Sequence, residues 1–532
     1  GQMIGEVYQG ERQNQAPKPL LDGYQQSQTA LARRAQLIVG SYDPTFVAAS
    51  NGLLYTLNPT LDQVQIGGER PLAGSDLNLS AAVSESRKGK LYLDNDQLNG
   101  FRLGALKVAA SDQIVVDGAL TVDRGGDITL YSPDVQIGAD LTARGGSLRL
   151  GNVLNQFLSS DTADTRLTAK VGKATQVTVA DGVQLDTRGV WSNLRSNPND
   201  GASLASLNGG LVSIRSSGDI DLGAGSLLDA SSGGAVLANG KTRGGKGGDL
   251  TLESSAISAP GDTHLNLAGD LRGYGVTGGG TLTMQANRIL IGQTDKALAD
   301  NTLQLSADLL RKGFSAYNLI GLNGLDVAEG TAIDVHMPVY RFADAAPNQV
   351  SGVDPQTALE LWTPTLFQEN PTKGLLTQRA GASLTLQGGA SLIGLIDAAN
   401  SSLTLGRGSR ISVDPGQSIK LRGAGQITVE GELNAWGGAI DIRQQQFGSN
   451  KPATAIVVAD PSAHDRSIWI GEQAVLDVSG RTTTAVDALG RTYGQVGKGG
   501  SIIIGGEIDA KLATATAADA YVIVREGARL EA

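Results

Sequence analysis

Two stretches of the chain, VQIGADLTARGGSLRL at residues 135–150 and ITVEGELNAWGGAIDI at residues 427–442, follow one pattern without a gap. Apolar residues occupy the same positions in both stretches, and the paired glycines also coincide: Gly145, Gly146, Gly437 and Gly438. In each stretch, two short segments of alternating apolar and polar residues flank the glycine corner, and such alternation is typical of β-strands. A strand-and-corner unit that recurs at distant positions indicates a solenoid, in which stacked repeats share one core.

The composition agrees with stacked strands better than with a compact globule. Glycine accounts for 72 of 532 residues, about twice its average share of roughly 7%, whereas aromatic residues make up only 4%. The apolar residues, 40% of the chain, are mostly Leu, Ile, Val and Ala, which suit thin cores between strands. The net charge of −10 argues against nucleic acid as a partner, because nucleic acid requires a basic surface. The absence of cysteine hints at export.

The strand pattern is clearest in residues 380–445. Apolar–polar–apolar triplets follow one another there, each closed by Gly, Asp, Asn or Ser, the residues that favour turns. Antiparallel hairpins would favour Asn-Gly or Asp-Gly turns, but these corners contain Gly-Gly or Gly-x-Gly, and the unit recurs every two or three strands. We therefore predict an all-β fold, a parallel β-helix with loop excursions and a few short helices. About 20 coils are expected in a chain of this length.

A second signature is an apolar residue and an aspartate, followed by an excursion, a Gly-Gly pair and a strand. Its aspartates are Asp186, Asp229 and Asp477. Because the aspartate recurs in every copy, we interpret it as a residue that caps a turn by hydrogen bonding rather than as a catalytic group. Insertions that gather at one corner of a coil often mark the variable face of a solenoid.

A third correspondence aligns the Gly-Phe pairs that end at Phe101 and Phe314, an offset of 314 − 101 = 213. The two opening stretches are offset by 427 − 135 = 292 residues. These offsets indicate two copies of one longer unit, in which the second copy has about 292 − 213 = 79 more residues than the first. The additional residues must lie between about 336 and 426. Prolines cluster at the start of that region, where we expect a protrusion with a short helix at Thr357–Leu361. The alternative, that all coils look alike without any duplication, stays open.

These patterns divide the chain into four parts. Residues 1–42 form a polar N-terminal segment, either a linker or a helix over Tyr24–Leu37 that Asp22 would cap. Residues 43–292 form the first part of the β-helix, and residues 293–380 contain coils with a helical or loop protrusion. Residues 381–532 form the second part, which ends within a coil, so we expect the native polypeptide to continue.

Motifs that would carry chemistry are scarce. The histidines, His264, His336 and His464, are scattered, and the single Gly-Gly-x-Gly run that begins at Gly244 favours a turn over a calcium site. Two pairs of acids have the i, i+2 spacing that shares one face of a strand: Asp94 with Asp96, and Asp219 with Asp221. Such pairs are also common at solvated edges. We therefore predict no catalytic residues, metal or cofactor.

The run from Gln417 to Ile442 and the Leu-Asp-x-Ser-Gly blocks followed by Gly-Gly-Ser-Ile resemble the filamentous haemagglutinin family of bacterial exoproteins, over most of residues 43–532. The resemblance implies a very large right-handed parallel β-helix. It also implies export across the Gram-negative outer membrane by the partner β-barrel transporter of two-partner secretion. The secretion domain and the toxic tip of that family are not recognisable in the chain, so the resemblance implies the middle of a fibre.

We therefore expect a structural or adhesive stalk segment, extracellular or attached to the outer membrane of a Gram-negative bacterium. Its expected partners are host or bacterial cell surfaces, matrix polysaccharide and copies of itself, with a role in adhesion, biofilm or cell–cell contact. Two alternatives remain open at this point. One is a polysaccharide-degrading β-helix enzyme, and the other is a self-assembling extracellular fibre.

Overall fold

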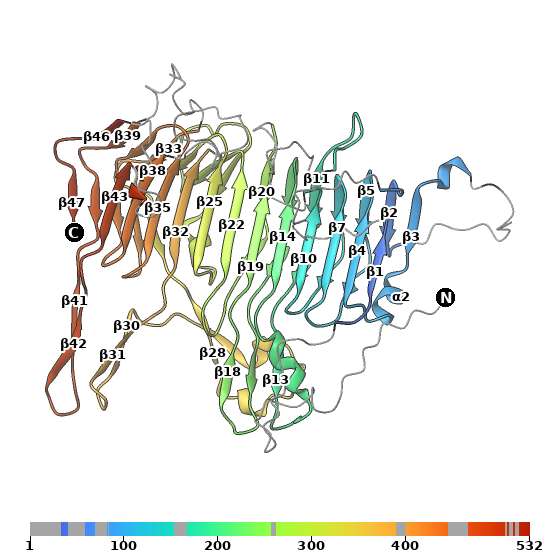
Figure 1. Cartoon of the computed structure of the whole chain (residues 1–532), viewed down its shortest axis with the longest axis horizontal. Coiled ribbons are helices and arrows are strands. Elements are labelled where there is room, and N and C mark those ends of the chain that lie inside the picture. Colours follow the sequence, from blue (N-terminus) through green and yellow to red (C-terminus); the bar gives the residue numbers. More distant parts are fainter. Residues whose placement is uncertain are drawn as a thin grey trace. The chain divides into compact units, whose positions relative to one another are not determined.

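The computed structural model describes residues 33–40, 59–69, 82, 84–153, 167–256, 262–389, 401–444, 467–505, 508–509, 514–515 and 521–532 (Figure 1). These residues belong to two compact units. Unit 1 takes the described residues within Gly1–Ile257, Leu265–Thr277 and Tyr340–Glu360. Unit 2 takes those within Ser258–His264, Gly278–Val339 and Leu361–Ala532.

Unit 1 contains three parallel sheets, named here in the order in which the chain enters them. The first sheet runs β1 (Gln36–Val39), β4 (Ala105–Ala109), β7 (Asp127–Tyr131), β10 (Ser147–Gly151), β14 (Leu211–Arg215), β19 (Asp249–Glu253). The second runs β20 (Leu265–Leu267), β15 (Asp219–Leu222), β11 (Gln176–Val179), β8 (Asp134–Ile137), β5 (Gln113–Val116), β2 (Gln63–Ile66), β3 (Lys90–Leu93). The third runs β21 (Asp270–Arg272), β16 (Leu227–Asp229), β12 (Gln184–Asp186), β9 (Leu141–Thr142), β6 (Leu120–Thr121).

Unit 2 repeats this arrangement. Its first sheet runs β22 (Thr281–Ala286), β25 (Ala316–Gly321), β32 (Ser383–Gly388), β35 (Ser418–Gly423), β38 (Ala439–Gln444), β43 (Ser501–Gly505). The second runs β24 (Thr302–Leu305), β23 (Arg288–Ile291), β26 (Leu325–Val327), β33 (Leu403–Leu405), β36 (Ile427–Val429), β39 (Ser467–Ile470), β46 (Tyr521–Val524). The third runs β27 (Ala332–Val335), β34 (Arg410–Val413), β37 (Glu432–Asn434), β40 (Val475–Asp477), β47 (Arg529–Glu531).

The remaining elements are short. A small sheet of unit 1 orders β13 (Trp191–Asn193), β17 (Gly234–Val236) and β18 (Thr242–Gly244). Two-stranded pairs are β28 (Val339–Phe342) with β29 (Leu359–Trp362), β30 (Phe367–Asn370) with β31 (Leu375–Gln378), β41 (Thr482–Val486) with β42 (Thr492–Val496), and β44 (Ile508–Asp509) with β45 (Thr514–Ala515). The helices are α2 (Asn95–Gly100) and the 3-10 helices η1 (Glu85–Arg87), η2 (Asp200–Ser206), η3 (Ala307–Arg311), η4 (Ala346–Asn348), η5 (Pro355–Thr357).

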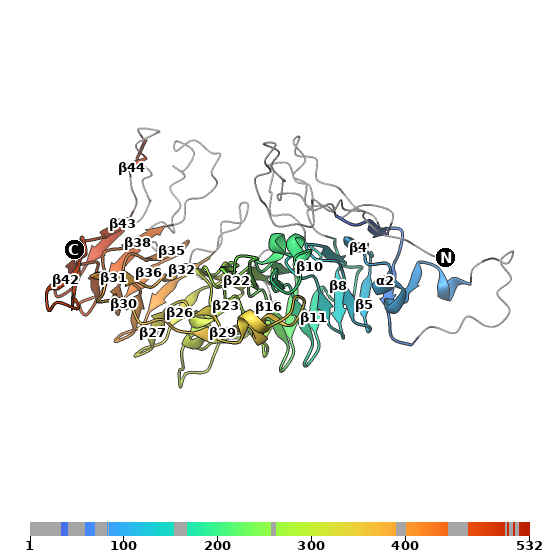
Figure 2. The ribbon, with the colours of Figure 1, turned by 90° about the horizontal axis from the view of Figure 1, so that it is seen from below.

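The strand register explains why alternating triplets form these sheets. In the second sheet of unit 1, where Figure 2 shows β5, β8 and β11 side by side, Ile114 pairs with Val135 and Val135 with Val177. All three side chains are fully buried. The neighbouring outward positions hold polar residues that bond along the sheet, since the Gln113 amide donates to Asp134 at 2.7 Å. Each buried aliphatic side chain contributes about 1.5–3 kcal/mol, so a slip by one residue would remove a whole column from the core.

The chain visits the three sheets of each unit in rotation, as β4, β5, β6 and then β7, β8, β9 do in unit 1. The fold is therefore all-β with long parallel sheets and very few helices. Connections from the second to the third sheet are short. The excursions that contain η2, β17–β18, β28–β31 and β41–β42 all leave after a third-sheet strand and return to a first-sheet strand.

The two units begin with the same series of elements. The pair β2–β3 is followed by α2, β4, β5 and β6, and the pair β23–β24 is followed by η3, β25, β26 and β27 in the corresponding sheets. The opening stretches also correspond, because β8, β9 and β10 occupy the same sheets as β36, β37 and β38. Between β27 and β35 lie the segment 336–382 and one further three-strand repeat, β32 to β34. Together these account for the additional residues of the second copy.

Three predictions about local structure were wrong. Gln36 and Leu37 belong to strand β1, so the helix predicted over Tyr24–Leu37 is wrong at its end, and its residues before 33 lie outside the described ranges. Asp354 caps only the single 3-10 turn η5, after which Leu359–Trp362 pairs as a strand, so the helix at Thr357–Leu361 is replaced by β29. Among the described residues the first sheet takes six strands in each unit, fewer repeats than expected, because the excursions use many residues.

Candidate functional site

The predicted corner glycines are held by close stacking of successive repeats. Gly145 and Gly437 have φ of +63° and +62°, a conformation that other residues adopt only with strain. The glycine that follows each of them lies against a neighbouring backbone: a Cβ would lie 1.8 Å from the oxygen of Gly126 at Gly146, and 1.9 Å from that of Gln417 at Gly438. The second glycine of each pair therefore leaves no room for a side chain.

The three signature aspartates make one and the same bond at the end of a third-sheet strand. In each, Oδ1 accepts a hydrogen bond from the backbone N–H two residues later, at 3.0 Å for Asp186, 2.8 Å for Asp229 and 2.9 Å for Asp477. This Asx turn bends the chain out of the sheet and into the excursion. The aspartates therefore have a local structural task wherever the signature occurs.

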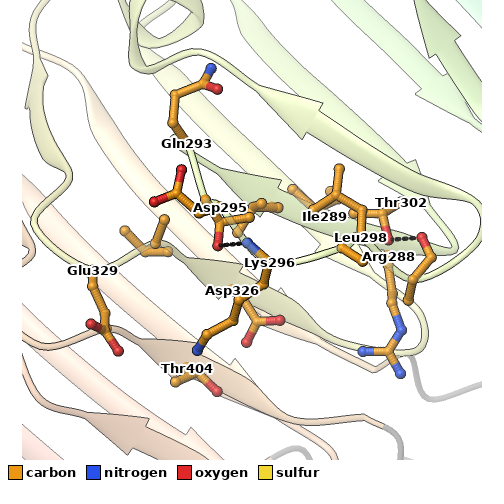
Figure 3. Close-up of a pocket in the computed structure, with 17 residues that line it drawn as sticks. Arg288, Ile289, Gln293, Asp295, Lys296, Leu298, Thr302, Asp326, Glu329 and Thr404 are labelled. Atoms are coloured by element: carbon orange, nitrogen blue, oxygen red, sulfur yellow. Dashed lines mark hydrogen bonds between the residues drawn. The ribbon is translucent and has the colours of Figure 1, made fainter.

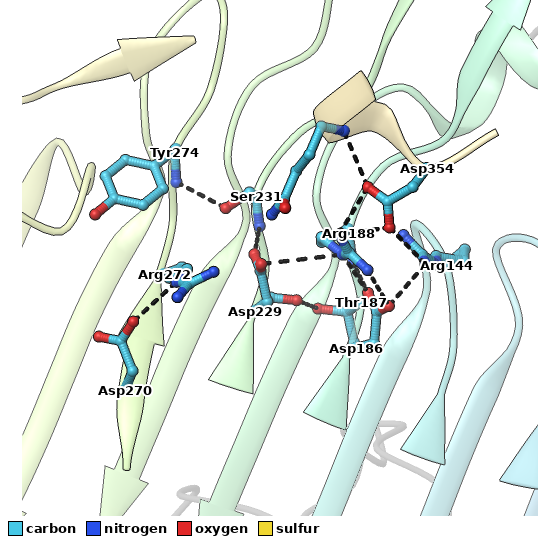
Figure 4. A network of polar contacts seen from close by, with 11 residues as sticks. Arg144, Asp186, Thr187, Arg188, Asp229, Ser231, Asp270, Arg272, Tyr274 and Asp354 are labelled. Atoms are coloured by element: carbon cyan, nitrogen blue, oxygen red, sulfur yellow. Dashed lines mark hydrogen bonds and ion pairs between the residues drawn. The ribbon is translucent and has the colours of Figure 1, made fainter. Parts of the chain in front are cut away.

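Around two of these aspartates, unit 1 builds a network of ion pairs (Figure 4). The guanidinium of Arg188 donates from Nε to Oδ1 of Asp186 at 3.1 Å and from Nη2 to Oδ2 at 3.0 Å, a two-pronged pair. Its Nη1 donates to Asp354 at 3.1 Å, and Arg144 pairs with Asp186 at 2.9 Å. The network therefore joins the third sheet to the segment Tyr340–Glu360, which carries Asp354.

Asp229 is the least satisfied member of this network. Its side chain is 3% exposed, its Oδ2 has no hydrogen-bond partner, and Nε of Arg188 lies 3.9 Å away. Burial raises the pKa of Asp229, although the bonds from Ser231 and the charge of Arg188 oppose the rise. For Arg188, burial acts to lower the pKa, but the bonds and charge of Asp186 raise it overall. A polar cavity of about 300 Å³ adjoins both residues.

Aromatic packing secures the same segment of unit 1. The Trp191 and Phe342 ring centroids are 6.1 Å apart, and those of Tyr274 and Tyr340 are 5.6 Å apart, in tilted arrangements that favour aromatic pairs. Trp191 also donates from Nε1 to the carbonyl oxygen of Gln349 at 3.3 Å. The ionic network and this cluster hold Tyr340–Glu360 against the excursions of unit 1, so both are structural.

A pocket of about 580 Å³ lies on the second sheet of unit 2, under the loop that joins β23 to β24 (Figure 3). Its lining brings together the acids Asp295, Asp326 and Glu329 with the cations Arg288 and Lys296. Burial raises the pKa of Asp326, while its hydrogen bond with Thr404 and the charge of Arg288 oppose the rise. A carboxyl group with a raised pKa beside a second acid is an arrangement that acid–base chemistry can use.

The acid pairs singled out in the sequence do not form comparable sites. Asp94 caps helix α2 by accepting from the N–H of Gln97 at 2.9 Å, and Asp96 lies within that helix, so these two acids do not share a strand face. Asp219 and Asp221 lie on the same face of β15, and both are half-buried. No pattern in the sequence indicates the pocket acids, because only the loop after β23 brings Asp295 to Asp326 and Glu329.

His264, His336 and the glycine run also stay apart from any cluster of metal ligands among the described residues. Burial lowers the pKa of His336, and so do the charges of Arg379 and Arg311; His464 lies outside the described residues. The run from Gly244 to Asp249 joins β18 to β19. It is not the local turn that the sequence favoured, because the N–H groups of Gly245 and Gly248 donate to the carbonyl oxygens of Gly233 and Ala230 in neighbouring repeats. Within the described ranges, no three His, Cys, Asp or Glu side chains are grouped as metal ligands would be.

Comparisons with family models, characterised proteins and solved structures gave no match for the chain. No helix in the described parts of the chain is long and apolar enough to cross a membrane.

Proposed function

We propose that each unit is a right-handed parallel β-helix and that the chain is a structural and adhesive stalk segment of a large exoprotein. The observation that carries this proposal is the rotation of the chain through three sheets with one apolar register, as in the pairing of Ile114, Val135 and Val177. In a parallel β-helix, each coil supplies one strand to each sheet, and the next coil stacks about 4.8 Å away. Right-handed crossovers are the rule between parallel strands.

The excursions supply the surface for binding. Several large apolar side chains on the hairpins of unit 2 and near them are exposed: Leu361 at 53%, Leu375 at 54%, Val486 at 55%, Leu489 at 76% and Val496 at 80%. Exposed apolar groups that gather on protruding elements are typical of contact surfaces. The proposed partners are host or bacterial cell surfaces, matrix polysaccharide and further copies of the chain. By resemblance, an outer-membrane two-partner secretion transporter exports it to the cell surface of a Gram-negative bacterium.

The test is adhesion of beads coated with the purified chain to living cells and to plates coated with matrix polysaccharide. Beads coated with heat-unfolded chain serve as the control for nonspecific attachment. We expect saturable attachment of the folded chain only, and equal attachment of both kinds of bead would contradict the adhesive role. An experimental density map tests the winding separately, because a left-handed path or sheets that do not stack would contradict the β-helix.

One observation favours a second candidate function, a polysaccharide-cleaving enzyme. The pocket in Figure 3 lies on the outer face of a sheet and combines Asp326, whose pKa is raised, with Glu329 and Lys296. Incubation of the chain with a panel of acidic polysaccharides decides between the two functions. Turnover that disappears in Asp326→Asn but persists in the matched variant Asp219→Asn would favour the enzyme.

A further inference from the structure

A groove lies between two hairpins of unit 2. The β30–β31 hairpin and the β41–β42 hairpin are joined by two hydrogen bonds. Gln495 donates from Nε2 to the carbonyl oxygen of Leu376 at 3.1 Å, and the backbone N–H of Ala488 donates to the carbonyl oxygen of Pro371 at 3.0 Å. Between the hairpins and the corner that joins β37 to β38 lies a cavity of about 820 Å³. This volume is within the range of about 300–1,000 Å³ that is typical of ligand sites.

Trp436 of the corner lines this groove in a fixed orientation. Its Nε1 donates to Oδ2 of Asp477 at 2.9 Å, and the guanidinium of Arg481 lies 4.7 Å from the centroid of its ring. Arg481 in turn donates from Nη2 to the same Asp477 oxygen at 2.7 Å. Trp436 is nevertheless only half-buried, and Phe367 also lines the groove. An immobilised indole with exposed surface is a platform for packing against an apolar face of a ligand.

The charge of the lining is opposite to that of the chain. Arg481 and Lys498 line the groove, and none of the residues that line it is Asp or Glu, whereas the whole chain has a net charge of −10. The Arg481 side chain is 52% exposed although it pairs with Asp477, and Lys498 is exposed. Asp477 offsets much of the charge of Arg481, so Lys498 gives the groove its excess of positive charge. An excess of positive charge in an acidic chain suits an anionic ligand.

Amide groups complete the lining. Gln378 donates from Nε2 to the carbonyl oxygen of Pro415 at 2.6 Å, and the bond from Gln495 to Leu376 holds the second amide. Both amides are therefore anchored at the wall of the groove before any ligand arrives, which lowers the entropic cost of binding. Aromatic surface, fixed amides and two cations match the apolar faces, hydroxyl groups and acidic groups of an anionic sugar chain.

We infer that this groove, the hairpin groove, binds an anionic oligosaccharide through Trp436, Arg481 and Lys498. The inference rests on the proposed adhesive function and assigns it a ligand class and a site. The acidic group pairs with Lys498 and Arg481, a sugar ring packs on Trp436, and hydroxyl groups bond to the amides of Gln378 and Gln495. Carboxylated and sulfated sugars share this chemistry, so the experiment compares both.

The experiment titrates the full chain by calorimetry with three probes: an oligogalacturonate, a heparin-derived oligosaccharide and the uncharged cellohexaose. Binding of one of the anionic probes, and none of cellohexaose, is expected. Lys498→Gln is expected to weaken that binding by about tenfold, the effect of losing one charge-assisted contact. Lys373→Gln is the matched control, because Lys373 is exposed at the turn of the β30–β31 hairpin and does not line the groove.

A second measurement does not depend on the charge. Binding is expected to change the tryptophan fluorescence, and Trp436→Phe is expected to remove most of that change while circular dichroism shows that the fold persists. Equal affinities of the wild type, Lys498→Gln and Lys373→Gln for the sugars would overturn the inference. The adhesive function would still stand in that case if the coated beads adhered in the bead assay. Binding of polyglutamate or single-stranded DNA as tight as that of the sugars, with the same sensitivity to Lys498→Gln, would overturn the ligand class.

Discussion

The substitution Gly146→Ala tests the close stacking of repeats in unit 1. A Cβ at this position would lie 1.8 Å from the carbonyl oxygen of Gly126, whereas carbon and oxygen atoms approach to only about 3.3 Å. The two repeats would have to separate locally by roughly 1.5 Å. That displacement breaks two bonds between these repeats, from the N–H of Ser147 to Gly126 at 3.0 Å and from the N–H of Gly125 to Arg144 at 2.8 Å.

The expected cost follows from these two effects. Each such hydrogen bond contributes about 1 kcal/mol net, and forcing an additional carbon into a packed interior costs about 1–3 kcal/mol. Gly146→Ala should therefore lower the free energy of unfolding by roughly 3–5 kcal/mol. This is a large fraction of the roughly 5–15 kcal/mol that stabilises a typical domain, so the loss is measurable.

The assay is urea unfolding followed by circular dichroism, with two matched variants in the same unit. Gly225 has φ of +71° and nothing within 4 Å of an added Cβ, so Gly225→Ala measures the backbone strain alone, about 1–2 kcal/mol. Gly100 has neither a positive φ nor a contact and lies at the end of helix α2, so Gly100→Ala should leave stability unchanged or raise it by up to about 1 kcal/mol. A loss in Gly146→Ala no greater than that in Gly225→Ala would refute the stacking argument.

Three further predictions concern the network and the core. Because burial raises the pKa of Asp229, the folded state keeps its proton to higher pH than the unfolded state does, and stability is lost as pH rises through the folded pKa. The urea midpoint of Asp229→Asn should therefore rise relative to that of the wild type as the pH is raised above about 4. A difference that stays constant with pH would contradict the burial effect. Asp354→Asn should lower the free energy of unfolding by about 1 kcal/mol, since this acid is 42% exposed. It should also speed proteolysis within Tyr340–Glu360, and an unchanged rate of proteolysis would show that the ion pairs do not hold that segment. Leu433→Ala should cost about 2–5 kcal/mol because Leu433 is fully buried, whereas the outward Thr428→Ala should cost less than about 0.5 kcal/mol.

The strands and corners could be predicted because their causes are local. Alternation of apolar and polar residues fixes which side of each strand faces the core, and both opening stretches show this alternation at the observed strands. The aspartates of the second signature bond to the N–H two residues later, a contact that lies within the motif itself. Short-range chemistry of this kind leaves a pattern in the sequence that a single chain is sufficient to reveal.

The ionic network could not be predicted, because its partners are remote. Asp354 lies 166 positions from Arg188, and the residues around Asp354 show only a turn signal, an aspartate before a proline. The helix predicted after it fails for the same reason: Leu359–Trp362 is a strand because β28 pairs with it. Long-range pairing therefore overrides local preference in the excursions, where no repeat constrains the sequence.

The excursions between the third sheet and the first are packed together in unit 1 but enclose a groove in unit 2. In unit 1, Tyr340–Glu360 packs against the excursion that carries Trp191, and the charges of Arg188 and Asp354 are paired. In unit 2, the hairpins that leave from this connection enclose a groove of about 820 Å³ beside Trp436. Apolar and ionic contacts inside unit 1 contribute to folding, whereas an open groove with exposed Lys498 contributes little to it. The fold does not need such a groove for its stability, so the proposed binding site is the role that the groove's lining suits.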